Sequence, residues 1–230
     1  MDPVAAKPVI VFDMDGVLAE VTESYRESIV RTVHHFTGKT IERDAIQDYK
    51  NRGGWNNDWA LSQKISADLG VAVDYDEVVD RFNVFFLGPK GDGEGLILRE
   101  NWFPKPGLLE RLSQKYELSI FSGRIRFEAD LTLRRFAPRM RFDPTLYADE
   151  IAAGKPAPDG LLEIQRRRPA SKLWYIGDTV DDARCARAAR VPFIGIAAQT
   201  HRKRGELIRL FERESATAIF ENVNEIEAIL

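Results

Sequence analysis

The sequence predicts an α/β fold in which a parallel sheet is interrupted by one long helical insertion. Three observations support this fold class. Short apolar runs recur along the chain, helix-like segments lie between them, and the interval 18–101 carries mostly helical signals and no clear strand. Continuous apolar strands that alternate with helices are typical of a parallel sheet covered by helices on both faces.

The predicted strands are short and almost wholly apolar, as expected of strands that are buried on both sides. They lie at residues 9–12, 118–121, 173–176, 193–196 and 218–220. The predicted helices between them lie at residues 127–136, 159–168 and 181–189.

The helical insertion follows the first predicted strand. Within it, Tyr25, Ile29 and Val33 recur at the spacing of one helix face, and glycines separate the helical stretches. We therefore predict a core domain made of residues 1–17 and 102–230, and an inserted helical domain of residues 18–101.

Composition narrows the classes of partner. The 230 residues include 33 basic and 36 acidic side chains, for a formal net charge of −3, and this balance gives no reason to expect a nucleic-acid or membrane partner. No apolar stretch approaches the ~18 residues of a membrane span, and the N-terminus lacks the pattern of a signal peptide. A single cysteine, Cys185, suits a reducing compartment. We expect a cytoplasmic protein, and the sequence leaves its oligomeric state open.

Four polar motifs are predicted at the carboxyl ends of strands, where ligands bind in open α/β sheets. They are Asp13-Met14-Asp15-Gly16, Ser122-Gly123-Arg124, the segment 154–159 with Lys155, and Gly177-Asp178 followed by Asp182. Asp181 is expected to be a solvated residue at a helix start. A single aspartate after a strand is most often a turn residue or helix cap, but four such motifs in one chain favour a reaction site.

In their order these motifs resemble those of the haloacid dehalogenase-like (HAD) hydrolase superfamily, subfamily I, with a helical cap of the C1 type inserted between the first and second motifs. The matching segments are 9–18, 106–111, 121–124, 154–159 and 176–189. The resemblance implies a Rossmann-like core. Most members of the superfamily hydrolyse phosphate esters through an aspartyl-phosphate intermediate, and the resemblance implies the same reaction here.

The residue types in the motifs suit that chemistry. Phosphate monoesters hydrolyse very slowly without a catalyst, so a covalent step and strong electrostatic stabilisation are needed. Asp13 is the candidate nucleophile, and Asp15 is the candidate acid for the leaving oxygen and then the base for water. Ser122 and Lys155 would stabilise the transferring phosphoryl group, beside which Gly16 lets the backbone turn.

Several carboxylates would converge with a phosphate dianion, so the charge balance requires a cation. Two like charges about 4 Å apart repel by roughly 4 kcal/mol at an effective dielectric constant near 20, and one lysine cannot offset several such pairs. Oxygen ligands without a His or Cys cluster indicate Mg²⁺. The resemblance implies Asp13 and Asp178 as direct ligands, with the backbone carbonyl of Asp15. Asp182 would either bind metal-bound water or hold Lys155.

Candidate substrate contacts lie in two places. Gly123 and Arg124 belong to the second motif, and Arg124 would either contact the phosphate or form a surface ion pair. In the insertion, Arg52, Asn56 and Asn57 lie in a polar segment with glycines, which suits recognition of a polar leaving group. The alternative for this segment is a helix start that Asn56 or Asn57 caps.

Together these features predict a Mg²⁺-dependent phosphatase that acts on a small phosphorylated metabolite. One alternative is a phosphomutase of the same superfamily, and another is a non-catalytic binding or regulatory protein on the same fold. The presence of Asp13, Asp15 and Lys155 together argues against the non-catalytic alternative. Asp15 and the metal-binding carboxylates argue against a 2-haloacid dehalogenase.

Overall fold

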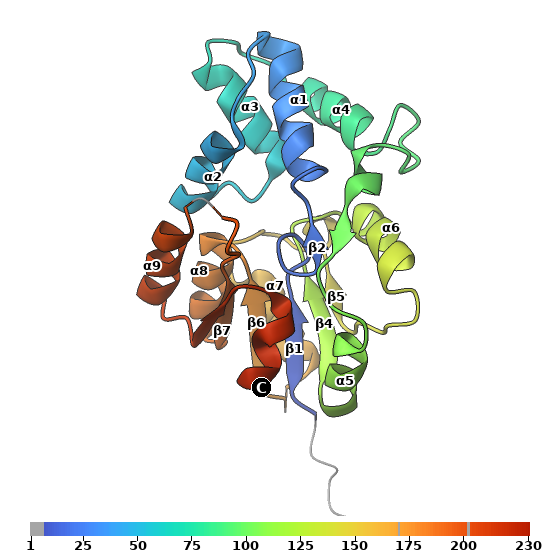
Figure 1. Ribbon diagram of the computed structural model, residues 1–230, viewed down its shortest axis with the longest axis vertical. Coiled ribbons are helices and arrows are strands. Elements are labelled where there is room, and N and C mark those ends of the chain that lie inside the picture. Colours follow the sequence, from blue (N-terminus) through green and yellow to red (C-terminus); the bar gives the residue numbers. More distant parts are fainter. Residues whose placement is uncertain (1–6, 170, 202) are drawn as a thin grey trace, which may run out of the picture. The chain divides into compact units, whose positions relative to one another are not determined.

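The computed structural model describes residues 7–169, 171–201 and 203–230, and its ribbon is drawn in Figure 1. The chain forms two compact units: one extends to Leu18 and resumes from Trp102 to Leu230, and the other is Ala19–Asn101. Within the described ranges, no helix has the length and apolar character needed to cross a bilayer. Residues 1–6, which the signal-peptide expectation concerns, lie outside the described residues.

The first unit is built on a parallel sheet, which confirms the predicted fold class. In the described part of the chain the sheet has six strands in the order β5-β4-β1-β6-β7-β8. The strands are β1 Val9–Phe12, β4 Glu117–Phe121, β5 Thr145–Leu146, β6 Leu173–Gly177, β7 Phe193–Ile196 and β8 Ala218–Phe220. The sequence analysis missed β5, because a strand of two residues leaves no apolar run.

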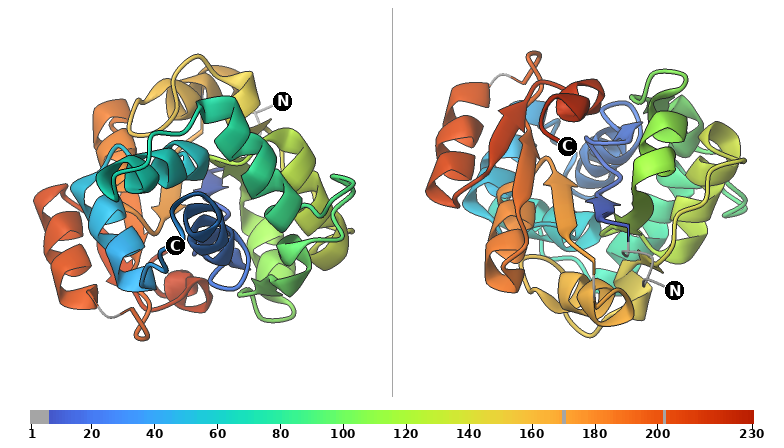
Figure 2. Two further views of the ribbon diagram at one scale, coloured as in Figure 1. Left: turned by 90° about the horizontal axis from the view of Figure 1, so that it is seen from above. Right: turned by 90° about the horizontal axis from the view of Figure 1, so that it is seen from below.

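Helices cover both faces of this sheet (Figures 1 and 2). Alternate residues of β1 enter two different apolar clusters: Val9 and Val11 belong to one, Ile10 and Phe12 to the other. This alternation explains why the whole strand is apolar. The helices of this unit are α5 Leu108–Lys115, α6 Arg126–Phe136, α7 Asp159–Arg167, α8 Val180–Ala189 and α9 Arg204–Arg213, with short 3-10 turns η2 Ala148–Glu150 and η3 Val223–Ala228.

The second unit is helical, as the sequence predicts. Its helices are α1 Tyr25–Thr37, α2 Arg43–Arg52, α3 Asp58–Asp68 and α4 Tyr75–Phe86, followed by the turn η1 Leu96–Arg99. Tyr25, Ile29 and Val33 are buried along one face of α1, and the rings of Tyr25 and Phe86 lie 4.0 Å apart. Two further strands, β2 Ala19–Glu20 and β3 Asn101–Trp102, form a separate two-stranded sheet.

Candidate active site

The carboxyl ends of three neighbouring strands bring together the first, second and fourth motifs. Phe12 of β1 pairs with Ile120 of β4 on one side and with Ile176 of β6 on the other. The backbone N–H of Asp13 then donates to the carbonyl of Ile176 at 2.8 Å, so Asp13 continues the register of the sheet. Because these strands are parallel neighbours, the residues that follow them share one edge of the sheet.

The third motif reaches this edge from a loop, which corrects its expected place at a strand end. The preceding strand, β5, ends at Leu146, and Lys155 lies in the loop between η2 and α7. The Lys155 side chain is nevertheless only 1% exposed, and its Nζ lies 2.9 Å from Asp13 Oδ1 and 2.7 Å from Asp182 Oδ1. The ammonium also lies 5.0 Å from the ring centre of Phe121 and 5.4 Å from that of Tyr175. Aromatic faces and two carboxylates thus replace the water around this buried charge.

Asp182 is held by four donors in the interior. Oδ1 accepts from the Tyr175 hydroxyl at 2.6 Å and is paired with Lys155, and Oδ2 accepts from the Thr179 backbone N–H at 2.9 Å and hydroxyl at 2.6 Å. A carboxylate offers about four acceptor sites, so these contacts fill them. Burial works to raise the pKa of Asp182, but Lys155 and the hydrogen bonds hold it below its ordinary value.

Sequence reasoning did not identify Tyr175 or Thr179 as part of this cluster. A signal for Thr179 was present, because a threonine followed three residues later by an acid is the pattern of a capping box. Thr179 and Asp182 form that box at the start of α8. The place of Tyr175 in an otherwise apolar strand gave no comparable signal.

Asp13 and Lys155 each influence the pKa of the other. Burial raises the pKa of Asp13 to about 7, the charges of Asp182 and Asp15 add to the rise, and Lys155 opposes it. Burial would lower the pKa of Lys155, but Asp13 and Asp182 outweigh it and keep that pKa above its ordinary value. Lys155 is therefore a permanent positive charge beside Asp13.

Asp178 completes a cluster of acids with Asp13 and Asp182, in which one oxygen from each residue lies within 4.8 Å of the others. Gly16 makes room for Asp178, because a Cβ at position 16 would lie 1.9 Å from Asp178 Oδ2. Gly16 also has φ of +73°, which glycine adopts without strain. Asp181 is only 3% exposed, which contradicts the expected solvated position. The first turn of α8 is packed in the core, and Arg184 lies 3.7 Å from the carboxylate.

The second motif places a buried arginine against Asp15. The Arg124 side chain is fully buried, whereas Asp15 is 31% exposed. The ion pair that the sequence analysis gave as one of two alternatives for Arg124 is therefore an interior pair and not a surface pair. Ser122 is buried, and its hydroxyl accepts from the backbone N–H of Arg124 at 3.2 Å. Gly123 between them is exposed.

In the helical unit, the polar segment contains the helix start that the sequence offered as an alternative. Asn57 caps α3, since its side-chain oxygen accepts from Ala60 N–H at 3.0 Å and its amide donates to the Tyr75 hydroxyl at 3.1 Å. Arg52 lies over the ring of Tyr49 at 5.2 Å, and Asn56 is partly exposed just before the cap. Contacts of these residues with a substrate stay predictions.

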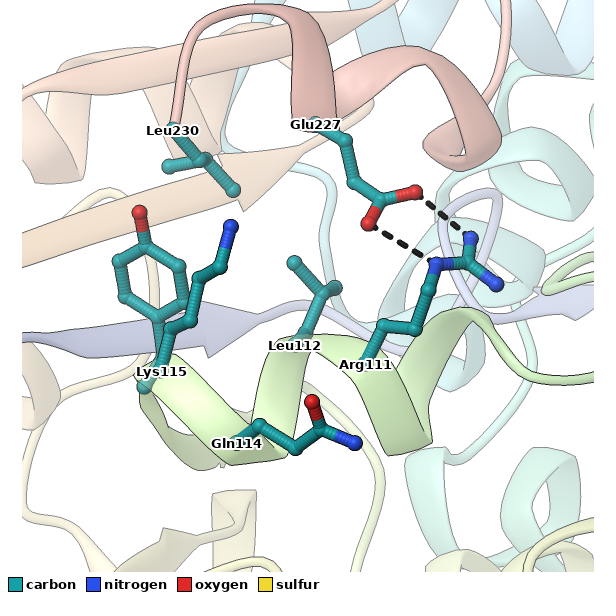
Figure 3. Close-up of a pocket in the computed structure, with 7 residues that line it drawn as sticks. Arg111, Leu112, Gln114, Lys115, Glu227 and Leu230 are labelled. Carbon is teal, nitrogen blue, oxygen red and sulfur yellow. Dashed lines mark hydrogen bonds and ion pairs between the residues drawn. The ribbon is translucent and has the colours of Figure 1, made fainter.

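A pocket of about 130 Å³ lies elsewhere in the first unit (Figure 3). Its lining includes Lys115 and Tyr116, which immediately precede β4, so it adjoins the amino end of that strand rather than the carboxyl end. Its acid, Glu227, faces Arg111, and the two form a two-point ion pair at 3.1 and 2.6 Å. Because Glu227 is paired with Arg111, this pocket does not combine a nucleophile with an unpaired acid, and we do not assign the reaction to it.

Known proteins share this architecture and sequence pattern. A family model described as haloacid dehalogenase-like hydrolase matches residues 7–190. A protein of Phytophthora nicotianae named imidazoleglycerol-phosphate dehydratase is 30% identical over 209 residues, which are 86% of this chain and 46% of that protein. The chain thus spans less than half the length of that relative.

Two further matches carry phosphatase names. A protein of Dickeya dadantii named probable phosphatase IndB is 24% identical over 207 residues, 85% of this chain and 83% of that protein. The solved structure of phosphatase Tt82 from Thermococcus thioreducens is similar with a TM-score of 0.65 and 25% identity, over 89% of this chain and 99% of that one. Since the family model covers most of the chain, this protein belongs to the haloacid dehalogenase-like hydrolases.

Proposed function

We propose that this hydrolase is a Mg²⁺-dependent phosphatase that acts on a small phosphorylated metabolite through an aspartyl-phosphate intermediate. The observation that carries the proposal is the buried Asp13 carboxylate 2.9 Å from Lys155, two residues before the 31% exposed Asp15. A nucleophile and an accessible acid, both following β1, thereby lie beside a fixed positive charge that a loop supplies. The phosphatase names of two similar proteins support the reaction type.

The reaction would take two steps. An oxygen of Asp13 attacks phosphorus as the bond from phosphorus to the leaving oxygen breaks, and Asp15 gives that oxygen its proton. Asp15 then takes a proton from water, the water oxygen attacks phosphorus, and Asp13 is released together with inorganic phosphate. Lys155 and Ser122 would stabilise the negative charge that develops on the phosphoryl oxygens.

The donor set fits Mg²⁺. Carboxylate oxygens are the ligands this ion prefers, and oxygens of Asp13, Asp178 and Asp182 lie within 4.8 Å of one another. Because four donors already fill Asp182, we assign the ion to Asp13 and Asp178, with the backbone carbonyl of Asp15, and give Asp182 the task of holding Lys155. When bound, the ion would offset the negative charge of the carboxylates and the phosphate.

A phosphate-release assay over a panel of phosphorylated metabolites tests this function. The panel should include sugar phosphates and imidazoleglycerol phosphate, the compound in the name of one relative. We expect free phosphate to appear as substrate is lost. Its release should stop when EDTA is added and resume when Mg²⁺ is restored. Ca²⁺ should restore release poorly, because it prefers a looser coordination. Full turnover in the presence of a chelator would refute the metal assignment.

The same assay separates the alternatives. A phosphomutase would convert a sugar phosphate into an isomer while free phosphate stays low. A non-catalytic protein would bind a phosphorylated compound without consuming it. Either result would replace the phosphatase proposal.

We further propose that the helical domain, residues 18–101, acts as a cap that selects the leaving group, whereas residues 1–17 and 102–230 supply the chemistry. The core motifs address only the phosphoryl group, so discrimination needs other residues. Arg52 and Asn56 are the candidates we retain for test, because both polar groups of Asn57 are already engaged.

Replacing Arg52 and Asn56 together by alanine tests the cap proposal. We expect kcat/KM for the preferred metabolite to fall roughly tenfold or more, since each buried polar partner left unpaired costs about 1–3 kcal/mol. Activity on 4-nitrophenyl phosphate should change much less. Asn57→Ala is the control for loss of the helix cap, and equal losses on both substrates in a folded double variant would contradict the proposal.

A further inference from the structure

Arg124 and Asp15 form an unusual ion pair beside the proposed reaction site. The guanidinium is fully buried, while the carboxylate is 31% exposed. Arg124 Nε donates to Asp15 Oδ1 at 2.7 Å, and Nη2 lies 2.6 Å from the same oxygen. Arginine more often spreads two bonds over both oxygens of a carboxylate. Here both close contacts fall on one oxygen.

The arginine is itself held in place from two sides. Its Nη1 donates to the hydroxyl of Thr132 on α6 at 2.6 Å. Its backbone N–H donates to Ser122 Oγ at 3.2 Å, which ties it to the loop after β4. Because a guanidinium is planar and stays charged at any pH a protein tolerates, this residue offers Asp15 a fixed support.

The contacts also decide which oxygen of Asp15 can carry a proton. Oδ1 accepts two N–H groups, which occupy its two acceptor sites. A proton on the carboxyl group must therefore reside on Oδ2. Among the described residues, no side-chain or backbone donor is recorded at that second oxygen.

We propose that Arg124 is a positioning residue, which fixes Asp15 by Oδ1 and leaves Oδ2 to exchange the proton. This inference rests on the proposed phosphatase function. In the first step the proton on Oδ2 passes to the leaving oxygen as the bond to phosphorus breaks. In the second step Oδ2 takes a proton from the attacking water. Holding one oxygen removes the rotational freedom that would otherwise misalign both transfers.

A direct contact between Arg124 and the substrate phosphate is the rival explanation. In the structure the arginine side chain has no exposed surface to offer a phosphate, and two of its nitrogens face Asp15. The two explanations predict different kinetics. A phosphate contact serves every substrate equally, whereas a positioned acid matters only where the leaving oxygen needs a proton.

Two aryl phosphates of nearly the same shape make this difference measurable. Phenyl phosphate releases a weakly acidic phenol, and 4-nitrophenyl phosphate releases a far more acidic one that departs with little help. The ratio kcat/KM covers steps up to departure of the leaving group, so the later hydrolysis of the aspartyl phosphate does not enter it.

In Arg124→Met, we expect kcat/KM for phenyl phosphate to fall roughly tenfold or more, because a positioned acid contributes about 10²–10⁴-fold. For 4-nitrophenyl phosphate we expect a loss below about threefold, since that leaving group draws little on the acid. Arg124→Lys keeps the positive charge but loses the paired N–H donors of the guanidinium. Its kcat/KM for phenyl phosphate should therefore lie between those of the wild type and Arg124→Met. Thr132→Val, which removes the hydroxyl that supports Nη1, should shift the ratio of the two kcat/KM values in the same direction by less. If Arg124→Met does not fold, these two variants carry the test.

A double-mutant cycle with Asp15→Asn provides the decisive comparison. If Arg124 acts through Asp15, adding Arg124→Met to Asp15→Asn should cause little further loss on phenyl phosphate. Additive losses, or equal losses on the two substrates in folded single variants, would overturn the proposal. Failure of the wild-type enzyme to release phosphate from either ester and from the metabolite panel would instead show that the proposed function itself is wrong.

Discussion

Asp13 and Asp182 both contact Lys155, but their surroundings differ. Asp182 accepts from Tyr175 and Thr179 as well, which stabilises its ionised form and leaves it little capacity to react. Asp13 has Lys155 as its only side-chain partner among the described contacts, and burial raises its pKa. Environments that shift the pKa values of two neighbouring acids in opposite directions are typical of sites where the two acids have different tasks.

The first prediction concerns the nucleophile. Asp13→Asn should abolish phosphate release, because an amide cannot form the acyl phosphate. Phosphate-release kinetics measure the loss, and circular dichroism should show an unchanged fold. Asp159→Asn, at an exposed position at the start of α7, is the matched control and should retain activity. Turnover within about tenfold of wild type in Asp13→Asn would contradict the covalent mechanism.

The second prediction concerns Gly16. Gly16→Ala places a Cβ 1.9 Å from Asp178 Oδ2, so Asp178 must move away from its present position. We expect the Mg²⁺ concentration for half-maximal activity to rise about 10–100-fold, as when groups that orient metal ligands are disturbed. Gly54→Ala is the control, because Gly54 also has positive φ but no atom within 4 Å of its added Cβ. Equal effects of the two changes would trace the loss to backbone strain alone.

At the scale of elements, the start of α8 carries both structure and site. Thr179 and Asp182 form a capping box, which satisfies N–H groups that would otherwise lack partners at the first turn. The same Asp182 holds Lys155. Folding of this helix end and placement of the lysine are therefore coupled.

The third prediction follows from this coupling. Thr179→Ala removes the hydroxyl that accepts from Asp182 N–H and donates to Asp182 Oδ2. It should lower the free energy of unfolding by about 1 kcal/mol, within the range of 0.5–2 kcal/mol for lost N-caps. Urea denaturation measures the change, and Thr179→Ser, which keeps the hydroxyl, should be close to wild type. An alanine variant as stable as wild type would show that the cap contributes nothing.

For the whole molecule, metal binding and folding should be linked through Asp13. The raised pKa means that the folded protein without metal holds a proton on Asp13 more tightly than the unfolded chain does. The contribution of this residue to stability therefore falls as pH rises from its ordinary pKa through about 7. A cation that replaces the proton restores that contribution.

The fourth prediction is that Mg²⁺ raises the melting temperature more at about pH 8 than at about pH 5.5, because the ion must bind ionised Asp13. Thermal denaturation with and without Mg²⁺ at the two pH values measures the difference. In Asp13→Asn the dependence on pH should largely disappear. A stabilisation by Mg²⁺ that is the same at both values in the wild type would exclude Asp13 as the linked group.

Local pattern was enough to predict much of this protein. The alternation of apolar strands and helices indicated the parallel sheet, because burial on both faces demands a continuous apolar run such as Val9–Phe12. The order of the motifs led to the correct family. The short β5 was missed, since two residues make no pattern and its pairing with β4 depends on the folded sheet.

Only the tertiary structure decided how the polar residues are partnered. Arg124 and Asp15 lie 109 positions apart in the chain, so their interior ion pair could not be inferred from either motif alone. The burial of Asp181 and the contacts of Asp182 with Tyr175 and Lys155 likewise come from tertiary packing, whereas the capping box of Thr179 and Asp182 is a local pattern. The sequence by itself determined which residue types stand at the strand ends, because that depends on short-range periodicity. The ion pairs and hydrogen bonds that most of these residues form depend on contacts between distant segments. Those contacts exist only in the folded chain.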